Sequence, residues 1–177
     1  MLRKGFGITR GFTLIELLVV LGIIVVLASI IFLATDEARK KGKDASIKSN
    51  LQTIRTQAAL FYVENNYSYL PPGGAGITPA SGGNPNNTCP LIVDSSVNSM
   101  FEADPVIFSA LQEALKYKAG NPGYRCANSA TAWAVTIRLN TSTSSSWCVD
   151  STGQSRQFAG NVGQVLANGT FICNTSL

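Results

Sequence analysis

An uninterrupted apolar run near the N-terminus constrains the fold of this chain more than any other feature. Between Leu14 and Ala34, Glu16 is the only ionisable residue. As an α-helix, these roughly 21 residues would be about 32 Å long, which matches the hydrocarbon core of a bilayer at about 30 Å. The run is longer than a signal-peptide core of about 7–15 residues. It therefore predicts a helix that anchors the chain in a membrane.

Glu16 is unexpected in this run, because an ionisable side chain at membrane depth is costly and usually functional. Thr13 and Glu16 are three residues apart, a spacing that suits a capping box at a helix start. Cleavage between Gly11 and Phe12 would create an amine four residues before Glu16, on the same helix face. Glu16 could then pair with this amine, with the amine of another copy, or, in a plain single-pass anchor, extend to the lipid headgroups.

The sequence of residues 11–16 (GFTLIE), followed by an apolar helix, resembles the class III signal of type IV prepilins and of the related pseudopilins of type II secretion. The resemblance is close over residues 1–35. It implies that a prepilin peptidase cuts after Gly11 on the cytoplasmic side and then methylates the amine of Phe12. It also implies a helical filament of identical subunits in which Glu16 faces the N-terminal amine of a neighbouring subunit.

The sequence and the resemblance together predict an α+β fold of the type IV pilin kind. In this fold, the first half of a long N-terminal helix crosses the membrane, and a small antiparallel β-sheet head follows the helix. The expected segments are a cleaved leader (1–11), an apolar transmembrane and assembly helix (12–35), an amphipathic continuation of the helix (36–66), and the globular head (67–177).

Apolar residues continue at helical spacing beyond the membrane segment. Steps of three and four residues separate Ile47, Leu51, Ile54, Ala58 and Phe61. This periodicity is typical of a helix with one buried face. Since no proline occurs before Pro71, we expect a single helix from about Phe12 to Asn66, with its apolar stripe packed on the head.

The head begins with a long loop rich in Pro, Gly and Asn, from Pro71 to Pro90. A short helix is expected from Pro105 to Lys118. Alternating apolar residues predict strands at Trp133–Leu139 and Trp147–Asp150, and a third strand is expected within Gln164–Cys173. These elements predict a small antiparallel sheet packed on the long helix.

The short helix has recognisable ends. Asp104 suits the N-cap, Pro105 suits the first helical position, and Gly120 suits the stop. The residues expected in the core are Ile107, Leu111, Ala114 and Leu115, together with the aromatic side chains of Trp133 and Trp147.

Four cysteines, all downstream of the apolar run, predict two disulfides formed in an oxidising compartment. They are Cys89, Cys126, Cys148 and Cys173. None forms a CxxC pair, which argues against a structural zinc site, and the four allow three pairings. The resemblance to pilins favours Cys148–Cys173, which leaves Cys89–Cys126.

Several classes of function are disfavoured by composition. The chain has no histidine, so most general-base, catalytic-triad and metal sites are not expected. The net charge of +4 comes mainly from Arg3, Lys4 and Arg10 in the leader, so nucleic acid is not expected as a direct partner. The basic cluster at residues 39–43 suits a solvated helix face. Asp150 supplies a single carboxylate, which is too few oxygen ligands for a calcium ion. We therefore expect no metal, no cofactor and no enzymatic activity.

The function expected from these features is structural. The chain is interpreted as a pilin subunit that polymerises through its N-terminal helix into a surface filament for adhesion, motility or DNA uptake. The alternative is a pseudopilin of a type II secretion or competence system. The expected partners are other copies of the chain, prepilin peptidase, the pilus assembly machinery and, before assembly, the lipid of the cytoplasmic or inner membrane. The chain would cross that membrane once, with its N-terminus in the cytoplasm, before it joins the surface pilus.

Overall fold

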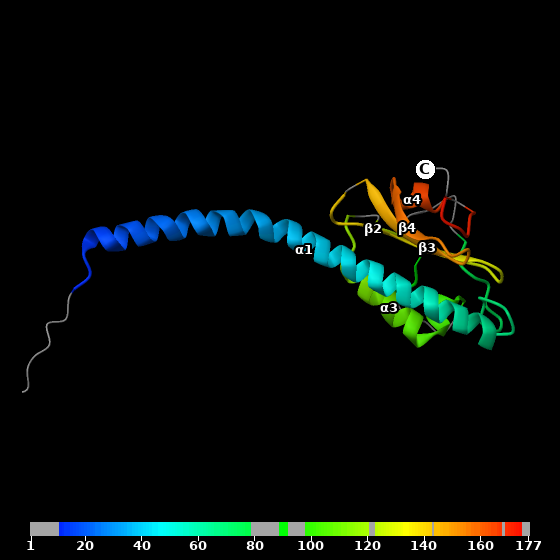
Figure 1. Ribbon diagram of the computed structural model, residues 1–177. Helices are drawn as coiled ribbons and strands as arrows, with labels where there is room; N and C mark the ends of the chain where they lie inside the picture. The colour runs from blue at the N-terminus through cyan, green and yellow to red at the C-terminus, as the bar shows by residue number, and fades with distance from the viewer. Residues whose placement is uncertain are drawn as a thin grey trace, which may run out of the picture. The chain divides into compact units, whose positions relative to one another are not determined.

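The structure is a computed structural model in which the chain forms two compact units, Met1–Arg39 and Lys40–Leu177 (Figure 1). The residues described are 11–78, 89–91, 98–120, 123–142, 144–167 and 169–174. Within the first of these ranges, the side chains of residues 31–34 are not described. The predicted α+β class is confirmed, since a long N-terminal helix is followed by a four-stranded antiparallel sheet.

The long helix, α1, extends over 51 residues from Leu14 to Glu64, two residues shorter at each end than predicted. It ends where Asn66 and Tyr67 adopt positive φ angles of 53° and 59°, because this left-handed backbone cannot continue a right-handed helix. The predicted apolar stripe is confirmed in its position. Ile47, Leu51, Ile54 and Ala58 are fully buried and Phe61 is half-buried.

Two short helices follow along the chain, α2 (Met100–Ala103) and α3 (Pro105–Lys116). The predicted cap of α3 is confirmed, since the carboxylate of Asp104 accepts hydrogen bonds from the backbone N–H groups of Val106 and Ile107 at 2.8 and 2.9 Å. All four of its predicted core residues are buried. The helix ends two residues earlier than predicted, and α2 was not predicted.

The sheet is an antiparallel meander in the order β1-β2-β3-β4. Its strands are β1 (Tyr124–Asn128), β2 (Trp133–Arg138), β3 (Ser145–Asp150) and β4 (Ser155–Ala159). The two strands predicted around Trp133 and Trp147 are β2 and β3. Trp133 is buried as predicted, whereas Trp147 is only half-buried.

The strand predicted within Gln164–Cys173 is wrong. The first two residues of this region belong to the helical turn α4 (Val162–Val165), and none of the described residues from there to Cys173 lies in a strand. The side-chain oxygen of Asn161 accepts hydrogen bonds from the N–H groups of Gly163 and Gln164. In return, the side-chain oxygen of Gln164 accepts a hydrogen bond from the N–H of Asn161. This capping box starts a helical turn where the apolar residues alone suggested a strand.

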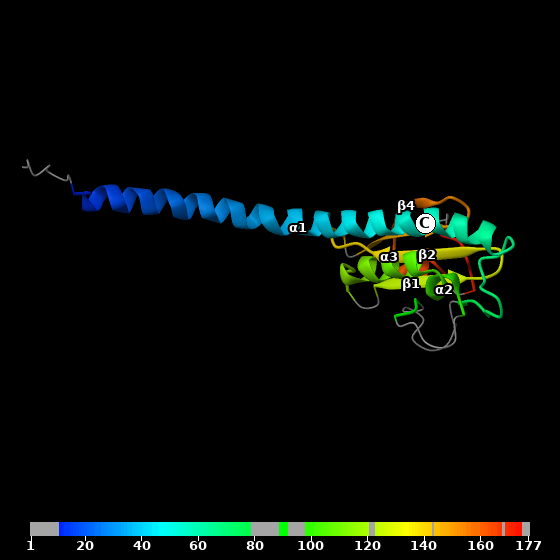
Figure 2. The same ribbon diagram turned by 90° about the horizontal axis from the view of Figure 1, so that it is seen from below.

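The sheet of the second unit is covered on both faces (Figures 1 and 2). α3 and the part of α1 after Lys40 lie over one face, where Val135 and Val149 are paired across β2 and β3 in the main core. α4 and the segment after it cover the other face, where Phe158 and Val165 pack beside Cys148 and Cys173. Because both faces are buried, the sheet has little exposed apolar surface of its own.

Two disulfides connect the head, with the pairing that the resemblance favoured. Cys89–Cys126 joins the loop before α2 to β1, and Cys148–Cys173 joins β3 to the C-terminal segment, with Cα–Cα distances of 4.7 and 6.1 Å. The loop predicted at residues 71–90 is described only in part, because residues 79–88 lie outside the described residues. Within the described part, Ile77 forms an isolated antiparallel bridge with Asn128 of β1.

Candidate assembly site

The candidate site lies at the beginning of α1, where Thr13 and Glu16 form a capping box. The backbone N–H and the hydroxyl group of Thr13 donate to Oε2 of Glu16 at 2.9 and 2.7 Å, and the N–H of Glu16 donates to the Thr13 hydroxyl oxygen at 3.3 Å. These bonds hold the carboxylate at the positive end of the helix dipole. The spacing of these two residues predicted this arrangement.

The carboxylate of Glu16 keeps room for a further partner. Both bonds that it accepts from Thr13 go to Oε2, so no described residue donates to Oε1. Gly11 and Phe12 precede the helix and are exposed, and the rest of the predicted leader, residues 1–10, lies outside the described residues. A cation brought close to the helix start could therefore bind the carboxylate without displacing its cap.

An extended apolar surface follows Glu16. The exposed fraction of the large apolar side chains between Phe12 and Ile30 ranges from 80% at Leu14 to 46% at Val20. Soluble proteins rarely expose a contiguous apolar surface of this extent, so lipid or other protein chains must cover it. Among the described residues, α1 is also the one helix that is long and apolar enough to cross a membrane.

In the head, a buried carboxylate fixes α1 to the loop between β2 and β3. Asp44 of α1 is only 3% exposed, and its oxygens accept bonds from the N–H of Asn140 at 2.6 Å and from the hydroxyl and the N–H of Thr141 at 2.6 and 3.0 Å. The side-chain amide of Asn140 donates both to Asp44 and to the carbonyl of Tyr117, which follows α3. These contacts form the Asp44 junction (Asp44, Tyr117, Asn140 and Thr141).

The Asp44 junction changes the acidity of its carboxyl group. Burial acts to raise the pKa of Asp44, but the bonds from Thr141 and Asn140 outweigh it and hold the pKa below its ordinary value. The sequence around Asp44 gives no sign of this role in the head, because the partners of Asp44 are 96 and 97 residues further along the chain. No local pattern could have shown this contact.

A second buried carboxylate, Asp150, organises the turn after β3. Its Oδ1 accepts bonds from the N–H and hydroxyl of Thr152 at 2.9 and 2.7 Å and from the N–H of Gln154 at 3.2 Å, while its Oδ2 accepts the N–H of Cys173 at 2.8 Å. The carboxylate is thus saturated by donors of the protein itself. Within the described ranges, no group of three or more His, Cys, Asp or Glu side chains is placed to hold a metal ion.

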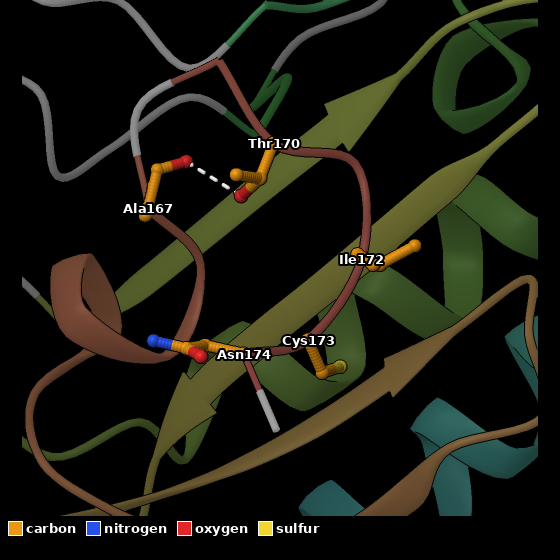
Figure 3. A pocket seen from close by; sticks show the side chains of 5 residues that line it. All are labelled: Ala167, Thr170, Ile172, Cys173 and Asn174. Carbon is orange, nitrogen blue, oxygen red and sulfur yellow. Dashed lines mark hydrogen bonds between the residues drawn. The ribbon is translucent and has the colours of Figure 1, made fainter. Parts of the chain in front are cut away.

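A hollow of about 240 Å³ lies beside the C-terminal segment (Figure 3). It is lined by Ala167, Thr170, Ile172, Cys173 and Asn174. The hydroxyl of Thr170 donates to the carbonyl of Ala167 at 2.8 Å, the bond drawn in Figure 3. None of the described residues that line this hollow is charged, so its shape alone does not indicate a ligand.

Comparison with known proteins identifies the N-terminal segment. Residues 9–32 match the prokaryotic N-terminal methylation motif, which covers the capping box and most of the apolar surface. No curated protein and no solved structure matches the chain. The motif implies processing by a prepilin peptidase and assembly into a pilus-like filament. The chain therefore carries the class III signal that is shared by type IV pilins and pseudopilins.

Proposed function

We propose that this protein is a structural pilin subunit, which polymerises through its N-terminal helix into a type IV pilus-like surface filament. The observation that carries the proposal is the exposed apolar surface of α1, with the carboxylate of Glu16 at its beginning, inside the methylation motif. Among the described residues of the first unit, no apolar partner covers this part of the helix. Its surface is explained if lipid covers it first and other subunits cover it after assembly.

Maturation would prepare the helix for this exchange. A prepilin peptidase cuts between Gly11 and Phe12 and methylates the new amine of Phe12, while the apolar helix lies in the cytoplasmic or inner membrane. The basic residues Arg3, Lys4 and Arg10 favour a cytoplasmic position for the leader. The amine created by cleavage stays positively charged and is the cation that the free oxygen of Glu16 requires.

Assembly would place Glu16 of one subunit against the Phe12 amine of its neighbour. In a dry helix bundle, an unpaired carboxylate carries a penalty of several kcal/mol, and only a close cation offsets it. Subunits shifted by one or more helix turns would leave both charges unpaired. The pair would therefore set the register between subunits, and the pilus assembly machinery of the membrane would supply the work of extraction from lipid.

The head would be the part displayed on the filament surface. In this proposal, residues 12–35 form the transmembrane and assembly helix, residues 36–66 continue it into the head, and residues 67–177 form the head itself. The disulfides Cys89–Cys126 and Cys148–Cys173 hold its loops, as is common in small secreted domains. The role is structural and needs no catalytic residue and no cofactor.

The mass and the location of the native protein test the proposal. We expect the intact chain to begin at Phe12 with one additional methyl group, and we expect filaments sheared from the cell surface to contain it. Dispersed chains that still begin at Met1 would contradict the proposal. Processed and methylated chains that are confined to the envelope, with no surface filament under native conditions, would instead identify a pseudopilin, which has the same signal.

A further inference from the structure

The head contains a second candidate site, at a small hollow between α1 and the turn that joins β3 and β4. Its volume is about 120 Å³. Arg55 and Ala59 line it from α1, where a spacing of four residues places both on one face. Tyr69 lines it from the segment after α1, and Ser151 and Gly153 line it from the turn. All of these residues belong to the second unit.

Arg55 supplies a positive charge to this hollow. The residue is half-buried, and within the described part of the chain no hydrogen bond or ion pair is found for its guanidinium group. Gly153 has a φ of 97°, and a Cβ atom at that position would lie 3.7 Å from Nη2 of Arg55. A glycine here thus leaves the approach to the guanidinium open. Its donors are arranged in a planar fork that matches a carboxylate.

Ser151 adds a second donor to the hollow. Its hydroxyl oxygen accepts the N–H of Trp133 at 3.3 Å, which leaves the hydroxyl proton to be donated elsewhere. Asp150 also lines the hollow, but it is 1% exposed and its oxygens accept bonds from the turn and from Cys173. The polar groups available to a ligand are therefore donors, and they suit an anion.

An aromatic surface leads from the hollow to solvent. The ring of Tyr69 lies 4.5 Å from that of Tyr62, which lies 5.7 Å from that of Tyr67. Tyr67 is 71% exposed, so this aromatic group reaches solvent. We refer to Tyr62, Tyr67 and Tyr69 as the tyrosine surface. Of these three residues, Tyr69 lines the hollow together with Arg55, and the rings of Tyr62 and Tyr67 extend from it.

We propose that this hollow binds the carboxylate of a uronic acid unit in an acidic saccharide. Arg55 binds the carboxylate through two parallel N–H donors, Ser151 donates a third bond, and the sugar ring lies against Tyr69 and the rest of the tyrosine surface. A short acidic side chain of another protein would satisfy Arg55 but would leave the tyrosine surface uncovered. The site goes beyond the structural role proposed above, since it gives the head a ligand of its own.

The test is saturation-transfer NMR on the full chain in detergent micelles, with galacturonic acid as the probe and galactose as its neutral match. We expect galacturonic acid to bind and galactose not to bind. Arg55→Gln should weaken the binding of galacturonic acid at least about tenfold, because it removes charge-assisted hydrogen bonds. Arg156→Gln is the matched control, since it removes the same charge from an exposed position on β4 and should leave binding within a factor of about two.

Three results would overturn the proposal. They are an absence of galacturonic acid binding to the unaltered chain, equal binding by Arg55→Gln, and equal weakening by Arg156→Gln. If circular dichroism shows that Arg55→Gln does not fold, the test uses the unaltered chain and compares its binding of galacturonic acid with its binding of the methyl ester of galacturonic acid. If the ester binds as strongly as the acid, the hollow is not a carboxylate site. Poor filament formation by Arg55→Gln without any saccharide binding would instead assign Arg55 to a contact between subunits.

Discussion

Removal of the Asp44 carboxylate should destabilise the head strongly. The Asp44→Ala substitution deletes four hydrogen bonds and leaves the N–H groups of Asn140 and Thr141 without their acceptor. A buried donor left without its acceptor costs about 1–3 kcal/mol, so for these two N–H groups we expect a loss of about 2–5 kcal/mol. Asp44→Asn keeps one acceptor oxygen but loses the charge, so we expect about 1–2 kcal/mol.

The measurement is urea denaturation of the full chain in detergent micelles, followed by the fluorescence of Trp133 and Trp147, both of which lie in the head. Asp36→Asn is the matched control, because Asp36 is exposed on the same helix and surface substitutions usually change the unfolding free energy by less than about 0.5 kcal/mol. If Asp44→Ala is no less stable than Asp36→Asn, the junction does not hold the loop to the helix.

The same carboxylate should make the stability of the head depend on pH. Because the pKa of Asp44 is lower in the folded chain than its unfolded value of about 3.9, the unfolded state takes up the proton first as the pH falls. The contribution of Asp44 is therefore complete above about pH 5 and is lost as the pH falls through the folded-state pKa. The unaltered chain should lose more stability than Asp44→Asn over this interval, and parallel curves would refute the assignment.

Three further outcomes are expected. Glu16→Ala should still be cleaved, methylated and inserted into the membrane but should enter filaments poorly, and normal incorporation measured by mass spectrometry of sheared filaments would exclude the pairing role. The double replacement Cys148→Ser and Cys173→Ser opens a loop with a sequence separation of 25 and should cost about 2–4 kcal/mol in urea denaturation, whereas dithiothreitol treatment of the unaltered chain should cost more, because it also opens Cys89–Cys126. Ile54→Ala should cost about 2–5 kcal/mol because Ile54 is fully buried, whereas Thr56→Ala on the exposed face of the same helix should cost far less.

The parts of the fold that the sequence predicted are those specified by local patterns. α1 and its buried stripe followed from the spacing of apolar residues, and α3 followed from that spacing together with the cap at Asp104. β2 followed from large apolar residues at every second position from Trp133 to Leu139. In each case, neighbours within a few residues determine the backbone conformation. For the two helices they also determine the buried face, whereas β2 is buried at both kinds of position from Trp133 to Ile137.

The missed strands lack such a pattern. β1 is buried at all five positions, including Arg125, so apolar and polar residues do not alternate along it. The side chain of Arg125 donates to the carbonyl groups of Gly163 and Leu166, near α4, a contact over 38 and 41 residues that no local rule predicts. β4 is an edge strand with one buried residue, Phe158, and therefore shows little apolar signal. The Asp44 junction and the hollow at Arg55 depend on long-range contacts in the same way.

The two units of the chain differ in how their polar and apolar groups are satisfied. In the head, the buried carboxylates of Asp44 and Asp150 accept bonds from the protein itself, and the apolar residues pack on both faces of the sheet. In the first unit, the situation is reversed, since one oxygen of Glu16 accepts no bond from any described residue and the apolar side chains around it face outward. A helix of this kind reaches a low free energy only beside lipid or other protein chains. The unit whose contacts are incomplete is thus the one that the methylation motif marks for assembly.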